Sequence, residues 1–183
     1  MGSQSSMTEP IGESIKSLMR SFPQGVTIVT GVADGSPFGV TVSAFSSVSL
    51  EPPLVMVSMS KGTRARDMLS TASAFTINVL SADQSDIAER FAGRSDSHRY
   101  RFEGINTRVG SNGCPIFSSA VGYLECSGWS QHEEGDHTMI VGRVTEAGLN
   151  GDSPPLVYYK RRYTTVVTPA ADSEAHDSLL AEW

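Results

Sequence analysis

Short hydroxyl side chains are unusually dense in residues 41–49, which read Thr-Val-Ser-Ala-Phe-Ser-Ser-Val-Ser. Such side chains add donors and acceptors and let a ligand approach the backbone closely, which suits the edge of a polar planar molecule. The same hydroxyls could instead bond the local backbone of a serine-rich loop. The segment therefore predicts either a ligand-binding edge or an ordinary loop.

A second group of hydroxyls stands beside cations, because Ser58, Ser60 and Thr63 are interspersed with Lys61 and Arg64. Neutral donors at the start of a helix, together with a cation, are a common arrangement around phosphate. The net charge of the chain is −6, yet ten of its fourteen cations fall in three short runs, namely Lys61/Arg64/Arg66, Arg90/Arg94/Arg99/Arg101 and Lys160/Arg161/Arg162. The runs predict either a pocket for a small anion or ordinary solvated charges.

Histidines and carboxylates meet in residues 131–137, Gln-His-Glu-Glu-Gly-Asp-His. These side chain types are suitable metal ligands. However, the segment has the composition of a turn between two strands, and no third histidine is near it in the sequence. We therefore expect no metal site, although His132 and His137 keep that alternative open.

Several signatures of other enzyme classes are absent from the sequence. It contains no Gly-x-Gly-x-x-Gly after a strand, no Gly-x-x-x-x-Gly-Lys-[Ser/Thr], no Gly-x-Ser-x-Gly and no His-Glu-x-x-His. A Rossmann dinucleotide site, a P-loop, a hydrolase nucleophile elbow and a zincin site are thus not supported.

Composition limits the remaining choices. The 183 residues are 39% apolar with 17 glycines, which is ordinary for one globular domain. No apolar run approaches the roughly 20 residues that span a bilayer, and the negative charge argues against nucleic acid or an anionic membrane as a partner. Cys114 and Cys126 are expected to be reduced and buried, and with no secretion signal we expect a cytoplasmic protein.

The elements that must position these residues follow from periodicity. Residues 11–22 have an apolar stripe at helical spacing and end at Pro23, Thr63 is a candidate N-cap, and Ser81 to Gln84 has capping-box spacing before a helix to Gly93. Asp34-Gly35 predicts a hairpin turn. Residues 94–118 are expected to be irregular. The predicted strands cover residues 25–33, 38–45, 54–59, 74–80, 120–130, 138–147, 157–159 and 163–168.

Many closely spaced strands, few helices and no βα alternation predict a mainly β protein, either a barrel or a sandwich. We expect one domain over residues 11–168, preceded by a flexible leader at 1–10. An acidic tail without Lys or Arg follows at 169–183.

Six motifs together resemble the flavin reductase-like domain, over about residues 15–166. They are FPQGVTIVT (22–30), GVTVSAFSSVSLEPPL (39–54), FTINVL (75–80), AERFA (88–92), GDHT (135–138) and PLVYY (155–159) with Tyr163. The resemblance implies a split β-barrel of the FMN-binding type with a few short helices. It implies a homodimer that binds FMN or FAD, oxidises NADH or NADPH, and supplies reduced flavin to a partner monooxygenase.

The resemblance also implies roles for individual residues. Thr41, Val42, Ser43 and Ala44 would line the edge of the isoalloxazine, and Ser58, Met59 and Ser60 would continue that wall. Thr63 and Arg64 would lie near the flavin phosphate, and Phe91 and Ala92 beside the ribityl or adenylate part. His137 would face the nicotinamide as an orienting catalytic residue, with Tyr159, Arg162 and Tyr163 also near NAD(P)H.

Some alternatives stay open at this point. The choices between FMN and FAD and between NADH and NADPH are not determined. Lys160-Arg161-Arg162 stands where the family often has an Arg-Gly turn, which bears on the choice of nucleotide. A non-catalytic flavin-binding protein or carrier would share every flavin contact. A barrel that uses residues 132–137 for metal or protein contacts is the other alternative.

Overall fold

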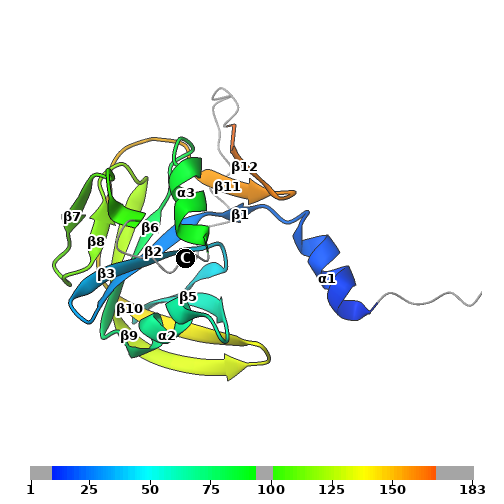
Figure 1. The fold of residues 1–183 in the computed structure, drawn as a ribbon, viewed down its shortest axis with the longest axis horizontal. Coiled ribbons are helices and arrows are strands. Elements are labelled where there is room, and N and C mark those ends of the chain that lie inside the picture. The colour runs from blue at the N-terminus through cyan, green and yellow to red at the C-terminus, as the bar shows by residue number, and fades with distance from the viewer. Residues whose placement is uncertain (1–9, 94–100, 168–183) are drawn as a thin grey trace, which may run out of the picture.

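A computed structural model describes residues 10–93 and 101–167, and its ribbon is shown in Figure 1. The predicted leader and tail, and the cations Arg94 and Arg99, lie almost entirely outside these residues. Within them, no helix is long and apolar enough to cross a membrane.

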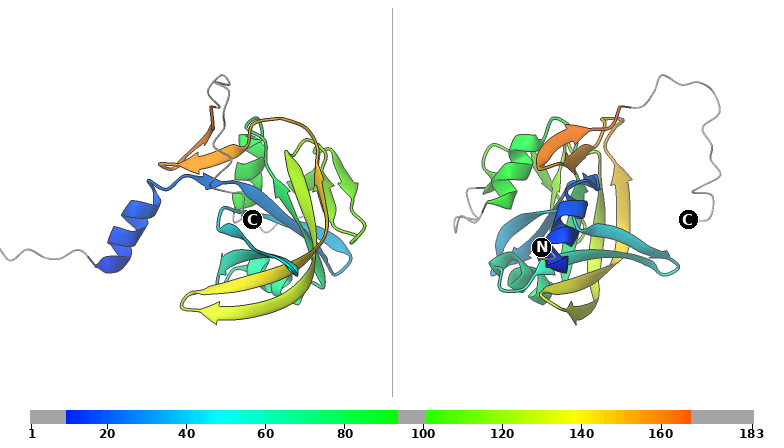
Figure 2. Two further views of the ribbon diagram at one scale, coloured as in Figure 1. Left: turned by 180° about the vertical axis from the view of Figure 1, so that it is seen from behind. Right: turned by 90° about the vertical axis from the view of Figure 1, so that its right-hand side faces the viewer.

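The molecule is built on one strongly curved sheet of seven antiparallel strands in the order β3-β2-β6-β9-β10-β5-β4 (Figures 1 and 2). The edge strands β3 and β4 are not hydrogen-bonded to each other, so the barrel is split rather than closed. The prediction of a mainly β fold is therefore confirmed. The strands are β2 Thr27–Ala33, β3 Ser36–Val42, β4 Phe45–Leu50, β5 Pro53–Ser60, β6 Ala74–Val79, β9 Gly122–Glu134 and β10 His137–Leu149.

Two small sheets and three helices complete the described part of the chain. One small sheet has the order β1-β11-β12, and the other pairs β7 with β8. Helix α3 packs on β3, whereas α1 stands away from the sheet (Figure 1). The bounds are α1 Ile11–Met19, α2 Arg64–Thr71, α3 Ser85–Ala92, β1 Gln24–Gly25, β7 Thr107–Val109, β8 Pro115–Phe117, β11 Leu156–Tyr159 and β12 Arg162–Thr165.

Three local predictions were wrong. The turn predicted over residues 131–137 is only two residues long, because β9 runs to Glu134 and β10 begins at His137. The stretch 94–118 contains the short hairpin of β7 and β8. Ser81 does not cap α3, which begins four residues later. The Gln84 side chain instead accepts the Ser81 N–H at 2.9 Å.

A close approach joins α3 to the sheet. Phe91 on α3 is fully buried, and its ring packs edge-on against Phe102 and Phe117, with centroids 5.0 and 5.5 Å away. On β3 the same ring meets Gly39, where a Cβ atom would lie 2.6 Å from it. Only a residue without a side chain lets α3 pack this closely, and α3 carries part of the pocket described below.

The two cysteines are buried and free, as the sequence predicts. Burial raises the pKa of the Cys114 thiol to about 11 and that of Cys126 to about 12. Because the thiolate is the reactive form, neither cysteine is suited to nucleophilic chemistry near neutral pH.

The turn between β11 and β12 carries two side chains in the left-handed region, Lys160 at φ 48° and Arg161 at φ 61°. This conformation favours glycine, because a Cβ atom costs about 1–2 kcal/mol there. We expect Arg161→Gly to raise the free energy of unfolding by about 0.5–1 kcal/mol after the larger chain entropy of glycine is subtracted. Urea denaturation measures the change. Arg162→Gly, one residue into β12, is the control and should lower stability.

Candidate functional site

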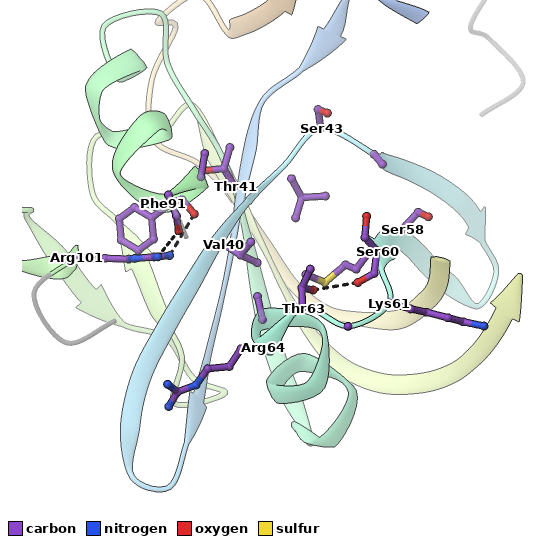
Figure 3. Close-up of a pocket in the computed structure, with 17 residues that line it drawn as sticks. Val40, Thr41, Ser43, Ser58, Ser60, Lys61, Thr63, Arg64, Phe91 and Arg101 are labelled. Atoms are coloured by element: carbon purple, nitrogen blue, oxygen red, sulfur yellow. Dashed lines mark hydrogen bonds between the residues drawn. The ribbon is translucent and has the colours of Figure 1, made fainter. Parts of the chain in front are cut away.

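A pocket of about 820 Å³ opens between β3, β5 and the facing ends of α2 and α3 (Figure 3). Its walls are residues 40–44, residues 58–65, residues 91–93 and Arg101. Every residue for which the family resemblance implies flavin contact lies in these walls, although the three segments are distant in sequence. The residues in question are Thr41, Val42, Ser43, Ala44, Ser58, Met59, Ser60, Thr63, Arg64, Phe91 and Ala92.

The start of α2 forms a positively polarised corner of the pocket. Thr63 is the N-cap, as predicted, and its hydroxyl accepts the Arg66 N–H and donates to the Ser60 carbonyl at 3.0 Å. Arg64, the first residue of the helix, lies in the wall, and no carboxylate of the described residues pairs with it. The helix dipole and the guanidinium both favour an anion here.

The other two cations of this run serve the structure instead. Lys61 pairs with Glu133 at 3.1 Å, and Arg66 bonds Glu133, Asp67 and the Thr138 hydroxyl. Lys61 and then Arg66 lower the pKa of the exposed Glu133 carboxyl. These contacts fix the tip of the β9–β10 hairpin to α2. Of the three cations, Arg64 is the one that no carboxylate of the described residues pairs with, so it is best placed to bind a ligand anion.

The hydroxyl-rich segment, residues 41–49, contains both kinds of residue that the sequence predicts: some hydroxyls bond the local backbone, and others line the pocket. In the exposed strand β4, the Ser46 hydroxyl donates to the Ser47 carbonyl and Ser49 accepts the Glu51 N–H, which are local bonds. The Thr41 hydroxyl donates to the Ala88 carbonyl at 2.6 Å, so only its lone pairs face a ligand. Ser43 lines the same pocket as Ser58 on β5 (Figure 3).

Arg101 closes the pocket at the end of α3, and sequence reasoning did not assign it there. Its buried guanidinium donates to the carbonyls of Phe91, at 3.3 Å, and of Gly93 (Figure 3). Arg90 in turn donates to the carbonyls of Arg101 and Glu103, at 3.4 and 2.8 Å. Burial lowers the pKa of Arg101. The only sequence signal was its place in the second run of cations.

His137 is adjacent to the pocket rather than in its wall. It lies directly opposite Ser60 in the register of β10 and β5, and its Nε2 is 3.1 Å from the Ser60 Oγ. Its Nδ1 is 2.8 Å from Asp136 Oδ1, a contact that lowers the pKa of the Asp136 carboxyl. His132 is on the neighbouring strand and bonds Ser130 at 3.1 Å. Within the described ranges, no three His, Cys, Asp or Glu side chains gather as metal ligands.

Tyr159, Arg162 and Tyr163 lie on the small β11–β12 sheet and are not part of the pocket wall of this chain. Tyr163 packs on the core beneath α3, with its ring 5.4 Å from that of Tyr158. Burial is the main cause that raises the pKa of the Tyr163 hydroxyl. Contact of these three residues with NAD(P)H stays a prediction.

Comparisons with known proteins agree with this geometry. A family described as "Flavin reductase like domain" matches residues 19–167. A "Probable flavin reductase" of Rhizobium meliloti is 44% identical over 135 residues, which are 72% of this chain and 42% of that protein. The reductase component of 4-hydroxyphenylacetate 3-monooxygenase from Thermus thermophilus is 35% identical, over 86% of this chain and 99% of its own length.

A solved structure of similar fold is described as the Streptomyces globisporus NADH:FAD oxidoreductase in complex with NAD and FAD fragments. Its TM-score is 0.81 at 30% identity, and the match covers 92% of this chain and all of that one. The chain spans about half the length of the first two curated relatives it matches, at 42% and 57%.

Proposed function

Because this chain belongs to the flavin reductase-like family, we propose that it is an NAD(P)H:flavin oxidoreductase that reduces FMN or FAD. The observation that carries the proposal is the convergence of three distant segments on one pocket with a hydroxyl edge and an anion-binding corner. The relatives described as flavin reductases or reductase components support the same activity.

The pocket residues fit a flavin. A volume of about 820 Å³ lies within the usual range for ligand sites. Thr41, Ser43 and Ser58 supply acceptors and donors for the polar edge of a planar ring, while Val42 and Met59 supply apolar contacts. Arg64 and the start of α2 supply the charge that a phosphate needs.

Hydride transfer from dihydronicotinamide to flavin is chemistry that the two cofactors supply, so the protein needs no nucleophile of its own. This chain has to hold the nicotinamide ring and the flavin ring in contact and in the orientation that hydride transfer requires. The wall formed by residues 41–44 and 58–60 orients one ring. His137, reached through Ser60, orients the second ring, and Arg64 anchors the phosphate.

The test is anaerobic bleaching of flavin absorbance, with FMN or FAD and NADH or NADPH in four combinations. Rapid bleaching in any pair supports the reductase and identifies its donor and acceptor. Flavin that binds without bleaching would indicate the carrier alternative. No flavin binding would overturn the proposal for this chain.

Arg64→Ala is expected to weaken flavin binding roughly 10-fold, because a charge-assisted contact to phosphate is lost. The loss should shrink for lumiflavin, which has no phosphate. Fluorescence quenching of the flavin measures both affinities. Arg108→Ala is the matched control, since that guanidinium stacks on the Tyr123 ring away from the pocket. Equal losses with FMN and lumiflavin would contradict the assignment of the phosphate corner.

The homodimer belongs to the same proposal. Helix α1 has no buried residue, and its apolar stripe, which includes Ile15 and Leu18, faces solvent. A second, smaller hollow is lined by residues 22–25 and shares Ser43, Ala44 and Ser58 with the main pocket. A second copy that covers both α1 and residues 22–25 would therefore lie beside the flavin edge. Light scattering after size-exclusion chromatography measures the mass of the particle in solution, which should be that of two chains.

Reduced flavin is proposed to leave the pocket for a separate oxygenase component. The relative described as the reductase component of 4-hydroxyphenylacetate 3-monooxygenase supports this role.

A further inference from the structure

Three polar side chains form a chain of contacts at the pocket rim. Ser60 ends β5, Asp136 lies in the tight turn, and His137 begins β10. The two distances are 3.1 Å from Ser60 Oγ to Nε2 and 2.8 Å from Nδ1 to Asp136 Oδ1. Of the three residues, only Ser60 lines the pocket.

The arrangement is held from both sides. The Lys61 N–H donates to the Asp136 carbonyl at 2.9 Å, which joins the end of β5 to the turn. The contacts of Glu133 with Lys61 and Arg66 tie the hairpin to α2. These contacts hold the backbone at His137 in place, and the ring is oriented by its bonds to Ser60 and Asp136.

The donors and acceptors in this chain can be assigned. The carboxyl of Asp136, whose ordinary pKa already lies far below neutrality, is ionised near neutral pH and can only accept. An imidazole that carries a single proton would hold it on Nδ1, facing Asp136, and its Nε2 would then be an acceptor. The Ser60 hydroxyl must donate its single hydrogen to Nε2. Only the lone pairs of Ser60 Oγ are left to face the pocket.

We propose that Ser60 is the hydrogen-bond acceptor for an N–H group of the bound cofactor, and that His137 and Asp136 are positioning residues that fix its direction. The inference rests on the proposed function. The planar cofactors offer such a group in two places, the carboxamide of the nicotinamide and the ring imide of the flavin. A ligand with only a carbonyl at this point would meet lone pairs and be rejected.

The first test needs no turnover. ¹⁵N NMR of the ligand-free protein should show His137 with its proton on Nδ1, and Asp136→Ala should move it toward Nε2. Ser60→Ala should perturb the Nε2 signal, and Ser60→Thr should restore it. The matched control is Ser130→Ala, which removes the hydroxyl beside His132 on the same hairpin. A His137 proton on Nε2 in the wild-type protein would overturn the assignment.

The second test separates the two sources of the N–H group. Ser60→Ala should weaken binding of NAD⁺ or NADP⁺ roughly 3- to 10-fold relative to the wild type. 3-Acetylpyridine adenine dinucleotide lacks the amide N–H, so its affinity should be the same for the variant and the wild type. If the flavin imide is the source, the same pattern should appear between FMN and its N3-methyl derivative. Equal losses for both members of both pairs would overturn the role of Ser60. Wild-type protein that fails to bleach flavin would instead count against the proposed function.

Discussion

His137→Ala is expected to lower kcat/KM for the nicotinamide donor by roughly 10- to 100-fold and to leave the protein able to bind flavin. His137 bonds the pocket residue Ser60 and is not itself in the wall, so its loss releases the Ser60 hydroxyl without removing any part of the wall. Misalignment of a reacting ring by about 1 Å is enough for a loss of up to about 100-fold. Anaerobic stopped-flow reduction at saturating flavin gives the rate constants.

The hairpin offers its own control for this variant. His132→Ala removes an imidazole with the same kind of serine contact, from the neighbouring strand and away from the pocket. It should leave both the rate and the nucleotide affinity unchanged. Reduction kinetics for His137→Ala equal to those of the wild type would exclude an orienting role for His137.

Phe91→Ala is expected to cost about 3–5 kcal/mol of the free energy of unfolding, the largest stability effect we predict. The ring is fully buried, contacts two other aromatic rings and packs against Gly39. Its loss leaves a cavity beneath α3, and the pocket wall at residues 91–93 loses its support. We therefore expect flavin affinity to fall as well.

Urea denaturation measures the free energy of unfolding. The value for Phe91→Leu should lie between those of the wild type and the alanine variant, because leucine leaves a smaller cavity. Leu149→Ala is the control, since Leu149 is 85% exposed and its truncation should change stability by less than about 0.5 kcal/mol. A cost for Phe91→Ala below about 1 kcal/mol would contradict the packing described here.

Local signals in the sequence were reliable where the chain makes its own contacts. The Asp34-Gly35 turn and the Thr63 cap depend on neighbouring residues, and both were predicted. The exposed end of β9 was missed, because residues 132–134 are polar on both faces and so carry no alternation. Strands β7 and β8 were missed because three residues are too few to set a period.

The pocket was predicted by resemblance and not by periodicity. Nothing in residues 41–44, 58–64 and 91–92 taken separately indicates that they meet. Arg101 shows the limit most clearly, since its side chain bonds carbonyls at the C-terminal end of α3, those of Gly93 and Phe91, which lie eight and ten residues earlier. Such a contact depends on the path of the chain in space, so spacing alone could not identify it.

The crossed contacts of Arg90 and Arg101 have a consequence for motion. Each arginine donates to backbone carbonyls of the other's segment, so the last turn of α3 and residues 101–103 hold each other in place. Neither segment can open without breaking bonds to the other, and the two should therefore exchange their amide hydrogens as one cooperative unit. A ligand too large for the pocket would have to displace this whole unit at once. Affinity should therefore fall abruptly, and not gradually, once a ligand exceeds the size that the α3 end of the pocket accepts.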